Sequence, residues 1–359
     1  EAGLEAPDMT KIREYRLKRV REKLVEFDCA GILLYDPVNI RYATDSTNMS
    51  LWTSHNAARY SLIMTEGPVI IFEFDAHEFL SNHNPLITEV RHALTYLYFT
   101  AGNKSKEKAK IWASEISDIV RESGKGNRRL AVDHCAPEGI HELQSLGLEL
   151  TNGEEVMELA RLVKSDDEVD AMRRSIFACE RSVELMRNYF KPGISEQELW
   201  SRFQMEAVNR GAEWIETRLL ASGPRANPWY QECSSRPIQA GELMGFDTDL
   251  VGSYGYCTDM SRTWLCGDEK PTNEQKEIYT SMSLLARSII LPASFSAATC
   301  FWLGLTLRKG RKFGSYFDFF AIWKILTDLW ITTKTVMTIK TRIHTASHCS
   351  AVQLDTSTK

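Results

Sequence analysis

The chain has 359 residues, of which 43% are hydrophobic and 25% charged, a composition typical of a folded globular protein with one large domain or two ordinary ones. Its formal net charge of −5 gives no electrostatic reason to expect nucleic acid or an anionic membrane as the main partner, so a small-molecule or peptide substrate fits better. The eight cysteines are scattered and include no CxxC pair. They indicate free thiols in a reducing compartment and therefore a cytoplasmic protein.

Residues 1–155 alternate between helical and strand-like patterns. Helices are expected over 9–27 and 104–121, where apolar residues recur at helical spacing among charges. Short apolar runs predict strands at 31–35, 60–64, 69–74 and 128–133, and the middle two read as a hairpin. Strands alternating with helices indicate an α/β domain that ends near residue 155.

Residues 156–280 read as a second, α+β unit. Ser165 and Glu168 have the spacing of a capping box, so a long helix is expected to begin there and to end near Phe190. A second capped helix is expected over 195–211. It is followed by a strand-like run, a proline-rich loop and the sequence "GFDTDLVGSYGYCTDMSRTW", which is typical of a β-hairpin.

Three aspartates lie within that hairpin. Because strand side chains alternate, Asp247 and Asp249 point the same way, and Asp259 on the return strand is expected roughly opposite them. Three carboxylates on one face repel one another unless a divalent cation is shared between them. Alternatively, they are solvated residues on an edge hairpin, but the apolar and aromatic residues around Asp259 count against this.

The runs "RLVKSDDEVDAMRRS" and "KPGISEQEL", together with the hairpin, resemble the catalytic domain of the creatinase/aminopeptidase P superfamily of "pita-bread" metalloenzymes. Residues 31–64 resemble the N-terminal domain of its creatinase–prolidase branch, and the resemblance covers about residues 10–280. It implies a creatinase-like α/β domain followed by a pita-bread domain that is incomplete at the C-terminus, and a homodimer. It also implies a site for two divalent metal ions, with iron favoured over manganese, zinc or cobalt and with Asp247, Asp249 and Asp259 as ligands.

Within the superfamily, "GEEVMELAR" and "GAEWIETRLLASGPRANPWYQE" resemble the dimethylsulfoniopropionate lyases of DddP type. That resemblance implies metal-assisted cleavage of a sulfonium zwitterion into dimethyl sulfide and acrylate, with a carboxylate base that removes the alpha proton. The residue that acts as this base is not assigned.

Xaa-Pro peptidases, or creatinase-type hydrolases, are the alternative within the same fold. In prolidase-like enzymes a histidine falls where this chain has Tyr230, and its loss removes a group that peptide hydrolysis uses. Trp229 and Tyr230 are then candidates to hold a cationic sulfonium over their rings, although loop packing explains them equally well. Nine residues separate Asp249 from Asp259 and eleven separate Asp247 from Asp259, where peptidases have ten, so either could be the primary ligand.

Residues 281–359 match no motif of the superfamily, whose metal site is completed by a histidine and two later glutamates. The chain has no histidine between His141 and His344 and no glutamate after Glu277. We expect a divergent tail, of the kind a frameshift or mis-splicing produces. A non-catalytic homologue that only binds or dimerises is therefore a further alternative.

Three remaining features carry weaker hypotheses. His344 and His348 have the spacing of ligands on one helix face, and residues 288–307 are a charge-free run of membrane-spanning length. A poorly packed tail without ligand or span is favoured over both. His55 could reach a substrate pocket, but a single loop histidine is more often structural.

Overall fold

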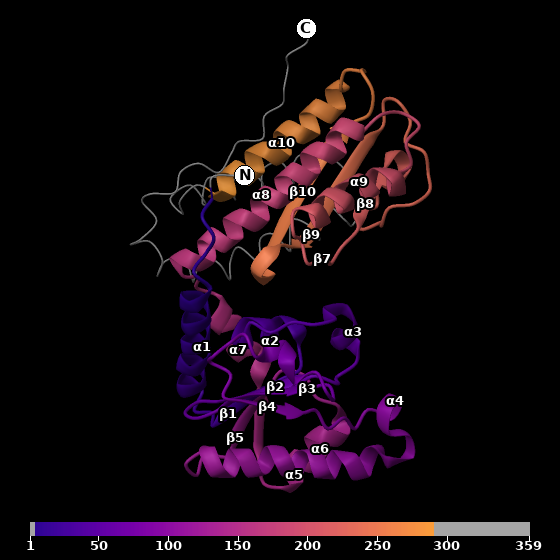
Figure 1. The fold of residues 1–359 in the computed structure, drawn as a ribbon. Coiled ribbons are helices and arrows are strands. Elements are labelled where there is room, and N and C mark those ends of the chain that lie inside the picture. Colours follow the sequence, from indigo (N-terminus) through magenta and orange to yellow (C-terminus); the bar gives the residue numbers. More distant parts are fainter. Residues whose placement is uncertain (1–3, 291–359) are drawn as a thin grey trace, which may run out of the picture. The chain divides into compact units, whose positions relative to one another are not determined.

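The computed structural model describes residues 4–290, with side chains to residue 281. They belong to two units, one that ends at Asp268 and one that begins at Glu269, and each is described by itself. The first unit contains two sheets, each covered by helices (Figure 1).

The first sheet has six strands in the order β4-β3-β2-β1-β5-β6. Neighbours β1–β2 and β2–β3 are antiparallel, while β3–β4, β1–β5 and β5–β6 are parallel. All four predicted strands and the hairpin are confirmed. Strands β4 and β6 were missed because "EVRH" and "ELTN" are short, polar and half exposed. The bounds are β1 Gly31–Leu34, β2 Tyr60–Met64, β3 Val69–Glu73, β4 Glu89–His92, β5 Arg129–Val132 and β6 Glu149–Asn152.

Helices cover both faces of this sheet, and side chains along β1 alternate between the two cores that these helices form with it. Leu33 belongs to the core with Trp112 of α5, whereas Ile32 belongs to the core with Val20 of α1 and Val156 of α7. Both predicted helices, α1 and α5, are confirmed. The helices of this part are α1 Met9–Glu26, α2 Pro37–Thr44, α3 Ser50–His55, α4 Tyr98–Ala101, α5 Ser105–Ser123, α6 Pro137–Ser145 and α7 Gly153–Arg161.

A buried ion pair lies beside the β2–β3 hairpin. The Nε atom of Arg59 donates to Oε2 of Glu73 at 2.8 Å, and Ser81 donates to Oε1 of the same carboxylate at 2.8 Å. Arg59 is 3% and Glu73 0% exposed. Both charges are therefore satisfied inside the protein rather than by water.

The second sheet carries the aspartates. Its strands run in the order β10-β9-β7, with β8 also paired to β9. The predicted capping box is present, since Ser165 and Glu168 exchange both hydrogen bonds at the start of the long helix α8. Side chains of α8, α9 and one face of β9 share a core. The bounds are α8 Asp166–Tyr189, α9 Glu196–Asn209, β7 Trp214–Ile215, β8 Leu219–Ser222, β9 Leu243–Val251 and β10 Cys257–Leu265.

The second unit is described only through the helix α10, Asn273–Ile290. Thr272 caps its start, because its hydroxyl accepts from the N–H of Gln275 at 3.2 Å. No helix between residues 4 and 290 is long and apolar enough to cross a membrane. The predictions for the divergent tail, for His344 and His348, and for all but the first residues of the 288–307 run lie outside the described residues.

Candidate functional site

The three aspartates lie on one open face of the β9–β10 hairpin. Antiparallel pairing places Asp259 directly opposite Asp249, and Ser261 opposite Asp247. The alternate residues Phe246, Thr248 and Leu250 are buried against the helices, so the aspartate side chains point to the other side. The predicted common face is confirmed.

Hydroxyl groups hold two of these carboxylates. Thr217, just before β8, donates to Oδ2 of Asp249 at 2.9 Å and accepts from its backbone N–H at 3.2 Å. Ser261 donates to Oδ1 of Asp247 at 2.7 Å. Partial burial, followed by the charges of Asp247 and Asp249, raises the pKa of Asp259 above its ordinary value. The face thus concentrates negative charge around Asp259.

These donors match a divalent metal in chemistry but fall short in number. Carboxylate and hydroxyl oxygens suit hard or borderline cations. Within the described side chains, however, no group of three or more His, Cys, Asp or Glu residues lies close enough together to hold a metal ion. We therefore derive no chemical step through a metal from these residues. The assignment of Asp247, Asp249 and Asp259 as ligands stays a prediction.

The proline-rich loop brings an aromatic ring to the same face. Gly245 precedes Asp247 by two residues and so shares its side of β9. A Cβ atom on Gly245 would lie 2.6 Å from Cζ3 of Trp229, so the indole packs directly on this glycine. Tyr230 follows in a left-handed conformation with φ of 70° and is 63% exposed. Trp229 thus borders the aspartate face, and its predicted contact with substrate is untested.

Glu196 anchors that loop at both ends and was not singled out from the sequence. It is 0% exposed, and its carboxylate accepts from the N–H and hydroxyl of both Ser222 and Ser234, as well as from Arg225. Burial alone would raise the pKa of Glu196, but these bonds outweigh it, so the pKa lies below its ordinary value. From the sequence it reads as an ordinary first-turn acid of α9.

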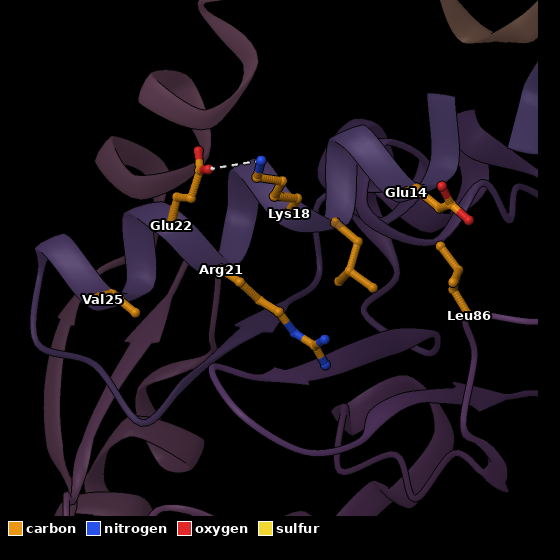
Figure 2. A pocket seen from close by; sticks show the side chains of 7 residues that line it. Glu14, Lys18, Arg21, Glu22, Val25 and Leu86 are labelled. Atoms are coloured by element: carbon orange, nitrogen blue, oxygen red, sulfur yellow. Dashed lines mark ion pairs between the residues drawn. The ribbon is translucent and has the colours of Figure 1, made fainter. Parts of the chain in front are cut away.

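Two cavities of the first unit lie elsewhere. A shallow pocket of about 430 Å³ runs along α1 beside Leu86 (Figure 2). Three of its charged groups have partners, since Lys18 pairs with Glu22 and Arg21 donates to backbone carbonyls. A groove of about 830 Å³ contains His55 together with residues of α3, α9 and β7. Helix α9 packs on the buried face of β9, so the part of the groove that α9 lines lies on the other side of the sheet from the aspartates.

Two protein-family models match the chain. The Creatinase/Prolidase N-terminal domain matches residues 16–163, and Metallopeptidase family M24 matches residues 170–294. Dimethylsulfoniopropionate lyase DddP of Roseovarius nubinhibens is 42% identical over 304 residues, which cover 81% of this chain and 68% of the relative. The DddP protein of Roseobacter denitrificans is 43% identical over the same shares. The chain belongs to metallopeptidase family M24.

Solved structures agree with this M24 fold. An Xaa-Pro dipeptidase from Bacillus anthracis is 22% identical and superimposes with a TM-score of 0.59, covering 77% of this chain and 70% of the other. A prolidase from Thermococcus sibiricus is 21% identical with a TM-score of 0.61, over 77% and 71% of the two chains. The predicted combination of a creatinase-like domain and a pita-bread domain is confirmed, as is the likeness to DddP-type lyases. The domain boundaries near 155 and 280 stay predictions.

Proposed function

We propose that this M24 chain is a metal-dependent lyase that cleaves dimethylsulfoniopropionate into dimethyl sulfide and acrylate. One observation carries the proposal: the Trp229 ring rests on Gly245, on the same strand face as the paired Asp249 and Asp259. A negative face beside an aromatic ring suits a substrate that has a carboxylate at one end and a sulfonium at the other. The two relatives named dimethylsulfoniopropionate lyase support the same assignment.

The chemistry is an elimination. A carboxylate base takes the alpha proton of the substrate, the C–H electron pair becomes the new C=C bond of acrylate, and the C–S electron pair leaves with dimethyl sulfide. Trp229 would orient the sulfonium by cation–π attraction and keep water from that side. We assign the base to no residue.

Two divalent ions with iron favoured, a homodimer and a cytoplasmic location complete the proposal. The oxygen chemistry and common face of Asp247, Asp249 and Asp259 support the metals, but the described side chains supply too few donors to complete the site. The free cysteines among residues 4–290 suit a reducing compartment. Sedimentation equilibrium of the full chain measures the oligomeric state directly, and a monomer would contradict the dimer.

Xaa-Pro hydrolysis is the second candidate, favoured by the M24 model and the prolidase neighbours. Tyr230 argues against it, because peptidases of this type have a histidine at that position of the loop. A non-catalytic homologue is the third, favoured by the shortage of donors among the described side chains.

The deciding experiment assays the full 359-residue chain after loading with Fe²⁺, Mn²⁺, Zn²⁺ or Co²⁺. Metal content is measured by mass spectrometry, dimethyl sulfide by gas chromatography, and proline release from an Xaa-Pro dipeptide in parallel. The lyase proposal expects bound metal and sulfide release that Asp259→Asn abolishes. Proline release without sulfide would establish the peptidase. Absence of metal and of both products would establish the non-catalytic homologue.

A further inference from the structure

Three buried side chains from distant parts of the sequence meet next to the aspartate hairpin. They are Arg16 of α1, Glu168 in the first turn of α8, and Tyr256 just before β10, and they are 2%, 1% and 8% exposed. Nε of Arg16 and the hydroxyl of Tyr256 both donate to Oε1 of Glu168, at 3.1 and 2.9 Å. One carboxylate oxygen therefore joins the first domain to the start of the second hairpin strand.

Glu168 does more here than cap its helix. Its other oxygen, Oε2, accepts from the N–H of Ser165 at 2.8 Å and completes the capping box. A capping box needs only that bond and the one that the N–H of Glu168 donates to the hydroxyl of Ser165. Oε1 is left to accept two further donors from outside the helix, both buried, and hydrogen bonds to a buried charge are among the stronger ones.

The guanidinium of Arg16 is fixed on two sides. Its Cζ lies 4.7 Å from the centre of the Tyr256 ring and 5.1 Å from that of Tyr42 on α2. Tyr256 also shares a small apolar core with Ile12 of α1 and Ala171 of α8. The hydroxyl of Tyr256 thus ends among charged and aromatic groups of α1, α2 and α8, and we call Arg16, Tyr42, Glu168 and Tyr256 together the socket.

The socket matters for the candidate site because Tyr256 directly precedes β10. Cys257 is the first residue of β10, and Asp259 lies three residues after Tyr256. From Cys257 to Leu265, β10 pairs with β9, and on its other side no strand of the described chain is paired to it. The socket therefore holds the end of β10 that lies nearest to Asp259.

We propose that Arg16, Glu168 and Tyr256 are positioning residues that fix the start of β10, and with it Asp259 opposite Asp249, against the first domain. The consequence for catalysis rests on the proposed function, in which these aspartates bind metal. The positioning of the strand does not depend on it. A substitution that removes the contact between these residues, at Tyr256 or at Arg16, should therefore increase the mobility of the same strand, β10.

The test is amide hydrogen exchange of the full, metal-free chain. Tyr256→Phe removes only the hydroxyl and keeps the ring, so exchange in residues 257–260 should rise about tenfold while β1 and β2 remain protected. Tyr254→Phe is the matched control, because Tyr254 lies in the same turn and packs on the same core, while its hydroxyl does not donate to Glu168, so exchange should be unchanged. Arg16→Lys keeps the charge but loses the planar contacts, and should raise exchange in 257–260 although it lies 241 positions before Cys257 in the chain.

Affinity for Mn²⁺ is the second readout, measured well below the melting temperature. Tyr256→Phe should lower the melting temperature by a few degrees and weaken Mn²⁺ binding several-fold at a temperature where the variant is still fully folded, which a loss of global stability alone would not produce. Increased exchange confined to α1 in Arg16→Lys, or unchanged exchange of 257–260 in Tyr256→Phe, would overturn the proposal. If the wild-type chain binds no metal and releases no sulfide, the proposed function fails, yet the exchange data still decide whether the socket positions β10.

Discussion

Asp249 and Asp259 face each other across β9 and β10 at a single position of the antiparallel ladder. Like charges placed directly opposite each other destabilise a sheet, yet the hairpin pairs regularly over nine positions, of which this pair is one. Without a counter-charge, the pairing of these two carboxylates therefore lowers the stability of the folded chain.

Asp259→Asn should change metal-free stability and metal affinity in opposite directions. The pKa of Asp259 is raised in the folded state, so its contribution to stability is present below its ordinary pKa and is lost as pH rises through the raised value. At neutral pH the substitution should thus stabilise the metal-free chain, by about 0.5 kcal/mol, while it weakens binding of Mn²⁺ or Fe²⁺. Urea unfolding and metal titration measure the two effects. Asp268→Asn, beyond the end of β10, is the control, and a loss of metal-free stability at Asp259 would contradict the prediction.

Gly245→Ala should displace Trp229 from the aspartate face. The new Cβ would lie 2.6 Å from the indole, too close for any real contact, and the residue has no backbone strain of its own that would confuse the result. We expect KM for dimethylsulfoniopropionate to rise about tenfold with bound metal unchanged. The double variant with Trp229→Leu tests whether the effect acts through the indole, because Gly245→Ala should not raise KM further once the ring is absent. Equal effects in both backgrounds would show that Gly245 acts independently of Trp229.

Glu196→Gln should loosen the loop that carries Trp229. The neutral amide presents one acceptor oxygen where the carboxylate presents two, so some donors of Ser222, Ser234 and Arg225 become unsatisfied, and we expect a loss of about 2–3 kcal/mol in urea unfolding. Glu198→Gln, on the same helix turn but exposed, should change stability by less than about 0.5 kcal/mol.

The same residue predicts a pH dependence. Because the folded-state pKa of Glu196 lies below its ordinary value, its contribution is present above that value and is lost as pH falls through the lowered one. Wild type should therefore lose stability on acidification more steeply than Glu196→Gln. Parallel curves for the two proteins would argue that the carboxylate charge is unimportant.

Arg59→Ala should destabilise the first domain by about 3–5 kcal/mol, because it leaves the fully buried Glu73 charge uncompensated. Lys125→Ala removes an exposed partner of Glu66 and should cost less than about 0.5 kcal/mol. Thermal unfolding followed by circular dichroism compares the two. Similar melting temperatures would show that water reaches Glu73.

The sequence predicted the elements whose patterns are strong and local. Strands β1 to β3 are dominated by apolar residues, Ser165 and Glu168 form the capping box at the start of α8, and the alternation of Asp247 and Asp249 predicts their common face. It did not predict the contacts that depend on distant segments. Nothing in the spacing of Glu196 indicates that two serines and an arginine of a later loop converge on it, and the buried pair of Arg16 and Glu168 joins residues 152 positions apart.

The order of strands in the second sheet has one more consequence. Within residues 4–290, β10 forms one border of that sheet and is paired on a single side. Any strand that adds to its outer side must follow the same alternation, so every second side chain of the added strand would project on the face that carries Asp259. Further metal-ligating side chains on such a strand would therefore lie on the same face of the sheet as the carboxylates. The same open border makes a shortened chain prone to edge-to-edge association.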